Sequence, residues 1–372
     1  MNEELTGRWA MAGRVLELTA GPDGLRLLAP GVPADHGLEL VPDAVGFVLR
    51  GHPYDGLTLR PDGADLLLGG GLRLVRDDAA TGPTAVPMPT PAPDPATERA
   101  FEAFTSEVRL AGGAEVQPPP HLALGDWLAW LPGRDELLFH GSPDGSIARL
   151  EPRRESWELQ DEGGRGNLAE VYATDDALWA LWFAVLDRDA IRGSLRSASE
   201  NFTGPDGRIT RFRFFSLDHR VLPHRPFADG WLYLLPRDTF RPLPILPGGP
   251  DSNEWGSPDA VAPLARLRVS PADVPYLDRV GTHDDGELMV FEEAADVLRA
   301  AHLDAAATGT GVVLRLAGSP ELLAALPTWA GLGERFLPGV SRRWEEHPDG
   351  TVSAFMDGPE ELAAMLRNVF LG

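Results

Sequence analysis

The stretch that decides the fold of the middle of the chain reads LLFHGS over Leu137–Ser142. Three apolar residues that run into His-Gly-Ser are typical of a buried strand whose C-terminal end presents polar side chains. Gly141 has no Cβ, which would let a ligand approach the backbone N–H and C=O groups closely. We therefore expect a strand here, with a binding edge beside His140.

A second informative stretch reads EVYATDD over Glu170–Asp176. A short strand here delivers Tyr172, and either Thr174 or Asp175 is expected to cap a helix over Ala177–Leu186. The residues that this helix is expected to pack inward are Leu178, Leu181, Trp182 and Val185. The pattern therefore predicts a strand, a cap and a core helix.

A third stretch, DSNEWGS over Asp251–Ser257, leads into the largely apolar Val261–Val269, which predicts a late strand. Together the three stretches resemble the signature motifs of the ADP-ribosyltransferase superfamily, in particular its histidine-tyrosine-acid branch, which includes the polymerases and the small rifampin-modifying enzymes. The resemblance covers the chain from about residue 130 to residue 285. It implies a mixed α+β domain that binds NAD.

The resemblance also implies roles for individual residues. His140 would hydrogen-bond an adenosine-side ribose hydroxyl, and Tyr172 would stack on the nicotinamide ring. Glu254 would accept a hydrogen bond from the nicotinamide ribose and stabilise the developing cation; Asp251 and Asp259 are alternatives for this third-motif acid. Further contacts to NAD are implied for the Gly141 backbone, which would hold the carboxamide, and for Ser142, Thr174 and Phe183.

The chemistry of NAD cleavage fits these residue types. Breaking the nicotinamide–ribose bond develops an oxocarbenium ion, so a site must orient the ribose hydroxyls, hold the leaving ring and place a carboxylate beside the charge. We therefore predict an NAD-dependent ADP-ribosyltransferase, or an NAD glycohydrolase, whose acceptor is a protein, a nucleic acid, a small molecule such as an antibiotic, or water. The alternatives are a non-catalytic module that binds a nucleotide or peptide, and a scaffold or regulator without NAD affinity.

The composition excludes several other chemistries. The chain has no Cys and no Lys, and all 33 of its basic residues are Arg. This excludes disulfides, thiolate nucleophiles, Schiff bases and the phosphate-loop lysine. We expect no metal site, because neither the pair His219 and His224 nor His283 with its two following Asp residues makes a three-ligand zinc set. Gly164–Ala169 has the spacing of a dinucleotide turn but follows polar residues, so we interpret it as a loop.

The charge balance argues against general nucleic-acid binding. A formal net charge of −23 repels phosphate backbones at long range, so such binding would need a local basic patch. Arg211 and Arg213 alternate along one expected strand, with Arg208, Arg220 and Arg225 nearby. The solvent face of an ordinary strand explains these arginines more simply.

Residues 1–77 are predicted to form an all-β, barrel-like module. Short apolar segments such as Val15–Leu18, Leu25–Leu28 and Leu66–Leu68 are separated by Pro-Asp-Gly turns, and no helical periodicity lies between them. The segment resembles the small lipocalin-like barrels that are appended to some bacterial hydrolases.

A proline-rich linker is predicted over residues 78–95. Its prolines lack the N–H that a β-ladder needs and break a helix, so we expect neither element there. The central α+β domain is predicted over residues 96–287, beginning with a helix from Ala96 to about Leu110.

The last part of the chain, residues 288–372, is predicted to be a βαββα module. A helix near 291–303 is expected first, followed by a strand at 311–316, a helix at 319–327, a hairpin across His347–Gly350 and a last helix from Pro359 to Phe370. The pattern resembles the C-terminal extension of WYL-type bacterial regulators, which implies a role in oligomerisation or regulation.

The sequence predicts a cytoplasmic location without membrane attachment. No apolar run approaches the roughly 18 residues that a membrane span needs. The start, Met1-Asn2-Glu3-Glu4, has neither the basic region nor the apolar stretch of a signal peptide. Heavy use of Ala, Arg, Gly, Pro and Leu is typical of a high-GC bacterial genome, which also explains the missing Lys.

Overall fold

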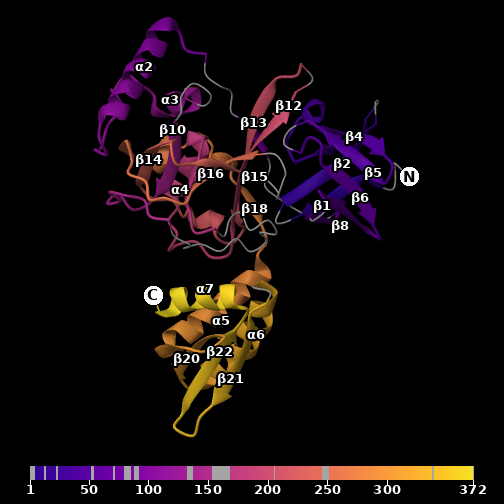
Figure 1. Ribbon diagram of the computed structural model, residues 1–372, viewed down its shortest axis with the longest axis vertical. Coiled ribbons are helices and arrows are strands. Elements are labelled where there is room, and N and C mark those ends of the chain that lie inside the picture. Colours follow the sequence, from indigo (N-terminus) through magenta and orange to yellow (C-terminus); the bar gives the residue numbers. More distant parts are fainter. Residues whose placement is uncertain are drawn as a thin grey trace. The chain divides into compact units, whose positions relative to one another are not determined.

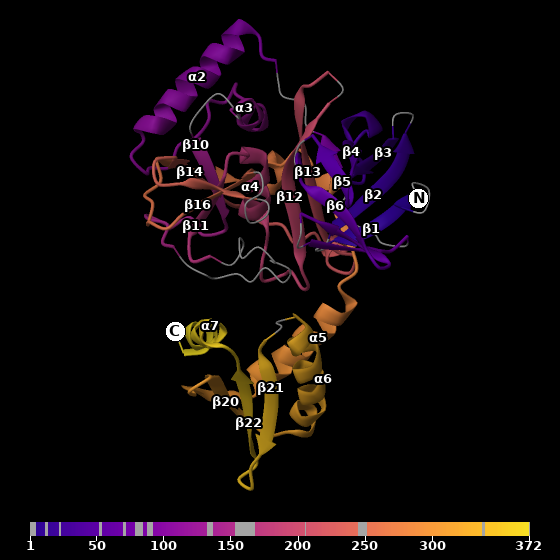
Figure 2. The same ribbon diagram turned by 45° about the vertical axis from the view of Figure 1, so that its right-hand side comes forward.

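The structure is a computed structural model, and its chain divides into two compact units (Figures 1 and 2). The first unit comprises Met1–Ile191 with Leu195–His283, and the second comprises Arg192–Ser194 with Asp284–Gly372. The structure describes residues 5–11, 14–21, 24–51, 54–69, 72–78, 85–87, 92–131, 137–152, 168–204, 206–244, 251–336 and 339–371. No helix in these ranges is long and apolar enough to cross a membrane.

The first unit begins with a closed antiparallel barrel of eight strands, which confirms the barrel-like module. The strands are β1 (Gly7–Met11), β2 (Arg14–Gly21), β3 (Gly24–Leu28), β4 (Leu38–Asp43), β5 (Gly46–Arg50), β6 (Thr58–Asp62), β7 (Asp65–Leu68) and β8 (Leu72–Arg76). The barrel closes where β1 pairs with β8 and Trp9 lies opposite Arg76. Alternate residues such as Leu25 and Leu27 point inward and are buried, so side chains fill the barrel.

The predicted linker contributes a strand, contrary to expectation. Strand β9 (Ala85–Pro87) pairs antiparallel with part of β13 (Ile209–Asp218), where Ala85 lies opposite Phe214 and Pro87 opposite Phe212. Only the end of this short strand is a proline, so its other residues can join the ladder. Residues 79–84 and 88–91 of the linker lie outside the described ranges.

The centre of the first unit is a six-stranded antiparallel sheet. Its strands are β10 (Leu137–Ser142), β11 (Val171–Thr174), β14 (Gly230–Pro236), β15 (Arg241–Pro244), β16 (Asp251–Ser257) and β17 (Ala265–Val269). They lie in the order β15-β16-β11-β10-β14-β17. If they are numbered one to six along the chain, the order is 4-5-2-1-3-6, which puts the first strand in the interior of the sheet beside the second.

One helix, α4 (Ala177–Val185), packs on a face of this sheet. Buried residues of α2 (Pro95–Leu110) and α3 (Leu124–Trp130) contribute to the same core. The helix expected from Ala96 is α2, which begins one residue earlier under the Asp94 cap. The expected inward residues of α4 are confirmed, since Leu178, Leu181, Trp182 and Val185 are all buried in the main core.

A second sheet joins the barrel to the central domain. It contains β12 (Leu195–Thr203), β13, β18 (Gly281–His283) and the short β9, with β13 at its centre. Phe212 and Phe214 of β13 pack into the barrel core, whereas Phe215 and Leu217 pack into the central core. Strand β13 is therefore buried on both faces.

Short 3₁₀ helices occur at Ala34–His36, Leu222–His224, Pro271–Asp273 and Leu277–Arg279.

The second unit is an antiparallel sheet with helices. Its elements are α5 (Gly286–Ala300), β19 (His302–Ala307), β20 (Gly311–Ala317), α6 (Pro320–Phe336), β21 (Ser341–Glu346), β22 (Thr351–Asp357) and α7 (Glu360–Leu371), with strand order β19-β20-β22-β21. The expected βαββα order runs from β20 to α7, but the prediction missed β19. The residues of β19 are Ala-rich, largely exposed and without a strand pattern. The helix expected near 291–303 therefore overlaps the start of this strand.

Candidate functional site

The three predicted motifs lie on three neighbouring strands of the central sheet. Strand β10 carries His140, β11 carries Tyr172 and β16 carries Glu254, and these strands are adjacent in the order β16-β11-β10. Thr174 of β11 lies opposite both Phe139 of β10 and Glu254 of β16. Segments more than 100 residues apart in the sequence are thus brought together.

Strands β10 and β11 part immediately beyond their single register pair. Strand β10 pairs with β14 over six positions, from Leu137 to Ser142, but with β11 only at Phe139. Beyond that point the His140 ring bonds to the strand β11 backbone, with Nδ1 2.8 Å from the carbonyl oxygen of Tyr172. A carbonyl oxygen only accepts, so Nδ1 must donate, and the other nitrogen of the neutral ring, Nε2, is then an acceptor.

Tyr172 and Glu254 share one face of the sheet. Residues opposite each other in an antiparallel ladder lie on the same face, as do alternate residues of one strand. Tyr172 lies opposite Gly256, and Thr174 lies opposite Glu254, so all four residues share a face. By the same alternation His140 lies on the other face and reaches Tyr172 where β10 and β11 part.

The Tyr172 hydroxyl holds the chain that leads into β11. It accepts a hydrogen bond from the N–H of Leu168 at 2.8 Å and is 3.1 Å from the carbonyl oxygen of the same residue, to which it can donate. The ring itself is half-buried. The hydroxyl therefore has a structural role. Most of the predicted loop before it, residues 164–167, lies outside the described ranges.

Gly141 serves helix packing. A Cβ on this residue would lie 2.0 Å from the carbonyl oxygen of Ala180 and 2.6 Å from the amide nitrogen of Ala184, both on α4. These are backbone atoms that cannot move aside, so only glycine lets α4 approach the sheet so closely. The expectation that the missing Cβ makes room for a ligand is therefore wrong on this face.

The other predicted contact residues have local structural roles. The Ser142 hydroxyl accepts a hydrogen bond from the Asp144 amide at 3.2 Å, and the ring of Phe183 lies 6.1 Å from that of Trp179 on α4. Thr174 is buried, and its hydroxyl donates to the carbonyl oxygen of Asn253 at 2.7 Å. Thr174 thus fixes the start of the β16 segment that carries the candidate acid.

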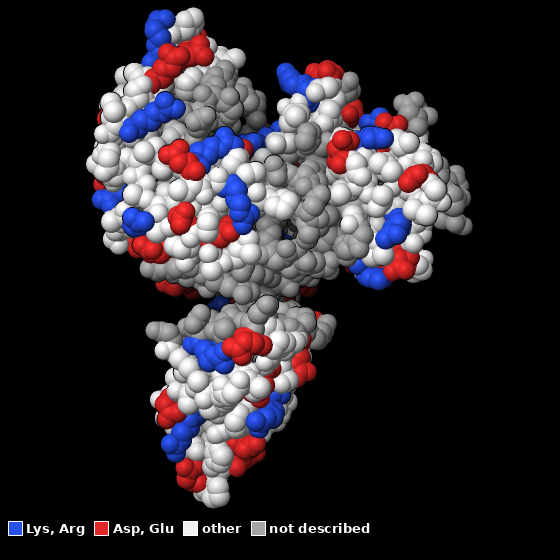
Figure 3. Space-filling view, viewed as in Figure 1, with Lys and Arg blue, Asp and Glu red and all other residues white. Residues whose placement is uncertain are grey.

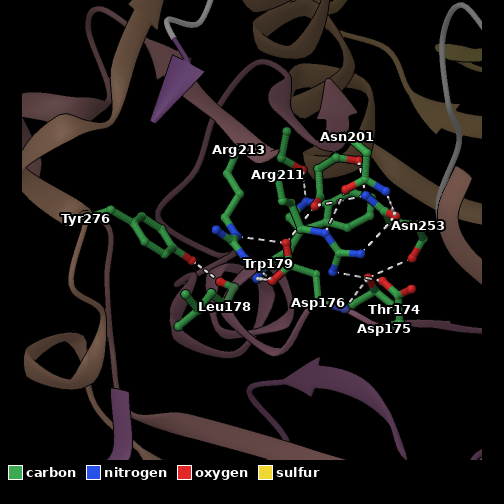
Figure 4. A network of polar contacts seen from close by, with 12 residues as sticks. Thr174, Asp175, Asp176, Leu178, Trp179, Asn201, Arg211, Arg213, Asn253 and Tyr276 are labelled. Carbon is green, nitrogen blue, oxygen red and sulfur yellow. Dashed lines mark hydrogen bonds and ion pairs between the residues drawn. The ribbon is translucent and has the colours of Figure 1, made fainter. Parts of the chain in front are cut away.

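The helix cap and its ion pair form a buried network (Figure 4). Asp176, not the expected Thr174 or Asp175, caps α4, since its Oδ1 accepts from the Trp179 amide at 3.3 Å. Arg213 Nε lies 2.7 Å from Asp176 Oδ2, and the two side chains are 4% and 0% exposed. Burial acts to raise the pKa of the Asp176 carboxyl, but Arg213 and the other donors outweigh it and hold the pKa below its ordinary 3.8.

Arg211 lies beside this pair and contacts Asp175, which follows β11, and Asn253 of β16. Its Nη1 is 3.0 Å from Asp175 Oδ1, and its Nη2 is 3.2 Å from Asn253 Oδ1. Burial raises the pKa of the Asp175 carboxyl above 3.8, although Arg211 opposes this. The arginines of β13 therefore form no solvent-facing basic patch, and Figure 3 shows basic and acidic residues intermixed over the visible face of each unit.

Glu170 is a further acid that the sequence prediction gave no role. It is 9% exposed, and its Oε1 lies 2.5 Å from Nη2 of Arg241. Its Oε2 has no hydrogen-bond partner among the described residues. This oxygen lies against Gly256, and a Cβ added to that glycine would be only 1.9 Å from it. The signal in the sequence was its position two residues before Tyr172, which puts both on one face of the strand.

The alternative third-motif acids lie at the two ends of β16. Asp251 starts the strand opposite Pro244, and Asp259 is exposed beyond its end. Glu254 lies within the strand opposite Thr174, on the face that Tyr172 shares. This position favours Glu254. Comparison of the chain with protein-family models, with curated proteins and with solved structures finds no significant match.

Proposed function

We propose that the central domain binds NAD and cleaves its nicotinamide–ribose bond, as an ADP-ribosyltransferase or, with water as acceptor, as an NAD glycohydrolase. The observation that carries the proposal is the arrangement of the three motif strands. The three residues come from adjacent strands: Tyr172 and Glu254 share one face, and the ring of His140, on the other face, bonds to the Tyr172 backbone where β10 and β11 part. A shared NAD site requires this kind of proximity.

The tautomer of His140 supports its proposed role. The bond from Nδ1 to the Tyr172 carbonyl fixes the orientation of the ring, and in the neutral form of the ring Nε2 is an acceptor. A ribose hydroxyl donates to such an acceptor. We propose that His140 orients the adenosine-side ribose in this way.

The shared face of Tyr172 and Glu254 supports the chemical step. The hydroxyl of Tyr172 is held by Leu168, so its orientation is set before substrate binds, and the half-buried ring can stack on nicotinamide. A carboxylate on the same face can accept from the ribose hydroxyl and stabilise positive charge that develops on the sugar as nicotinamide leaves. We propose these roles for Tyr172 and Glu254.

Nicotinamide release from NAD by the purified full-length chain tests the proposal. We expect release by the wild type and a loss of about 100-fold or more in Glu254→Gln and His140→Ala, because the first removes the carboxylate that stabilises the transition state and the second removes the group that orients the bound NAD. Asp238→Asn is the matched control, since it neutralises an exposed acid outside the three motifs. Asp251→Asn and Asp259→Asn test the two alternative acids.

The outcomes separate the candidate functions. NAD binding without nicotinamide release would favour a non-catalytic binding module. Absence of both release and any NAD-induced thermal shift would contradict the proposal and favour a scaffold. Mass spectrometry of products formed with protein, nucleic-acid or small-molecule acceptors, or with water alone, then identifies the acceptor class.

A further inference from the structure

We propose that Arg211 is a positioning residue that fixes Glu254 relative to Tyr172. The inference rests on the proposed function, which it deepens. It concerns a residue on β13, a strand of the other sheet, whose side chain reaches across to the motif strands.

The Arg211 guanidinium bridges the two motif strands at their register pair (Figure 4). Thr174 and Glu254 lie opposite each other, Asp175 follows Thr174, and Asn253 precedes Glu254. Arg211 contacts Asp175 Oδ1 at 3.0 Å through Nη1 and donates to Asn253 Oδ1 at 3.2 Å through Nη2. One rigid, planar group thus holds a residue on each side of the pair.

Asn253 transmits this constraint to Glu254. Its Nδ2 donates to the carbonyl oxygen of Ser199 at 2.8 Å, and its own carbonyl oxygen accepts from the Thr174 hydroxyl at 2.7 Å. The residue before Glu254 is therefore fixed by β12, β11 and, through Arg211, by β13. Such supporting contacts matter because a displacement of about 1 Å at a catalytic group can reduce a rate about 100-fold.

The remaining contact sets the orientation of the guanidinium. Arg211 Nε donates to Asn201 Oδ1 at 3.1 Å, and Asn201 Nδ2 donates to the same Asn253 Oδ1 at 3.1 Å. The Arg211 side chain is 20% exposed and that of Asp175 is 32% exposed, so water screens the pair only in part. Lysine could restore the ion pair with Asp175 but could not also make the two directed hydrogen bonds to Asn201 and Asn253.

The kinetic test compares Arg211→Ala and Arg211→Lys with Arg208→Ala, which removes an exposed arginine from the same hairpin. We expect Arg211→Ala to lower kcat for nicotinamide release by about 10- to 100-fold while the Kd for NAD stays within about 3-fold. Arg211→Lys should recover part of this loss, and Arg208→Ala should match the wild type. An unchanged kcat in Arg211→Ala would overturn the inference. A variant in which kcat, NAD affinity and thermal stability all fall together would also overturn it.

A second measurement does not depend on NAD. Hydrogen exchange followed by mass spectrometry should show faster exchange in Arg211→Ala over peptides that span Thr174 and Glu254, while peptides from β10 and β14 keep wild-type protection. Unchanged exchange at Thr174 and Glu254 would refute the positioning role even in a protein without NAD activity. Faster exchange in a protein that does not bind NAD would instead refute only the proposed function and leave Arg211 as a clamp on β16.

Discussion

Arg213 donates two hydrogen bonds to the carboxylate of Asp176, from Nε to Oδ2 at 2.7 Å and from Nη2 to Oδ1 at 2.8 Å. Asp176 also caps α4, and its Oδ2 accepts from the Ser199 hydroxyl at 2.5 Å. This one buried carboxylate therefore connects α4 to both β12 and β13. Strand β13 also carries Arg211. The Arg213–Asp176 pair therefore holds the strand from which Arg211 contacts the candidate site.

Removal of Arg213 should strongly destabilise the first unit. Arg213→Ala leaves a buried carboxylate with no cation bonded to it, which typically costs about 3–5 kcal/mol. The free energy of unfolding in urea measures this. The control is Arg268→Ala, whose ion pair with Asp229 is 63% and 55% exposed, so its loss should cost less than about 1 kcal/mol. Equal effects of the two substitutions would contradict a special role for the buried pair.

The stability of the first unit should decrease at acidic pH through Asp176. The folded pKa of this carboxyl lies below its ordinary 3.8, so its contribution to stability is complete above that value and is lost as pH falls through the folded pKa. We expect the unfolding free energy of the wild type to fall more steeply below pH 3.8 than that of Asp176→Asn. The measurement is urea unfolding at a series of pH values, and parallel curves for the two proteins would count against the assignment.

Neutralisation of Asp175 should have the opposite effect to neutralisation of its neighbour. Burial raises the folded pKa of Asp175, so folding disfavours its charged form, and this penalty grows as pH rises above 3.8. At pH 7 we therefore expect Asp175→Asn to keep or raise the urea midpoint of unfolding, whereas Asp176→Asn lowers it. A large loss in Asp175→Asn would show that its contact with Arg211 outweighs the cost of burial.

Local patterns predicted the elements that depend on local chemistry. Alternation and Pro-Asp-Gly turns indicated the barrel strands, and LLFHGS and VYAT each indicated the strand that the structure has. The burial of Arg213 and the partial burial of Arg211 could not be predicted in this way. Strand β13 is covered on one face by the barrel and on the other by the central core, and the acidic partners lie more than 30 residues away.

In the candidate site, too, local patterns predicted some features and could not predict those that depend on long-range packing. The sequence predicted the strands that carry His140 and Tyr172, because each has a recognisable apolar pattern. It expected Glu254 to precede a late strand, whereas Glu254 lies within a strand of its own, β16. It did not identify the support that Asn253 and Arg211 give to Glu254, because this depends on how β13 packs against the motif strands. It also attributed Gly141 to ligand access, since the close approach of α4 leaves no mark in the local sequence.

Replacement of Gly141 by alanine should disrupt the fold itself. The added Cβ would meet two backbone atoms of α4 at 2.0 and 2.6 Å, and overpacking costs about 1–3 kcal/mol, with the upper end expected where the opposing groups cannot move. Urea unfolding and circular dichroism of Gly141→Ala measure the effect. Gly125→Ala is the control, because its Cβ would approach no atom closer than 3.9 Å, and we expect a change within about 1 kcal/mol. Normal stability of Gly141→Ala would rule out the close packing of α4 on β10.

Substitutions of Tyr172 should separate its hydroxyl from its ring. Tyr172→Phe removes the bonds to Leu168 but keeps the aromatic face, so we expect a loss of about 1–2 kcal/mol in unfolding free energy with little change in nicotinamide release. Tyr172→Ala also removes the ring, and the loss of a stacking contact worth about 0.5–1.5 kcal/mol should reduce release by a further 2- to 12-fold or so. Steady-state release by folded variants of matched concentration measures the difference. If Phe and Ala reduced release equally, the hydroxyl and the loop it holds, rather than the ring, would be what the reaction needs.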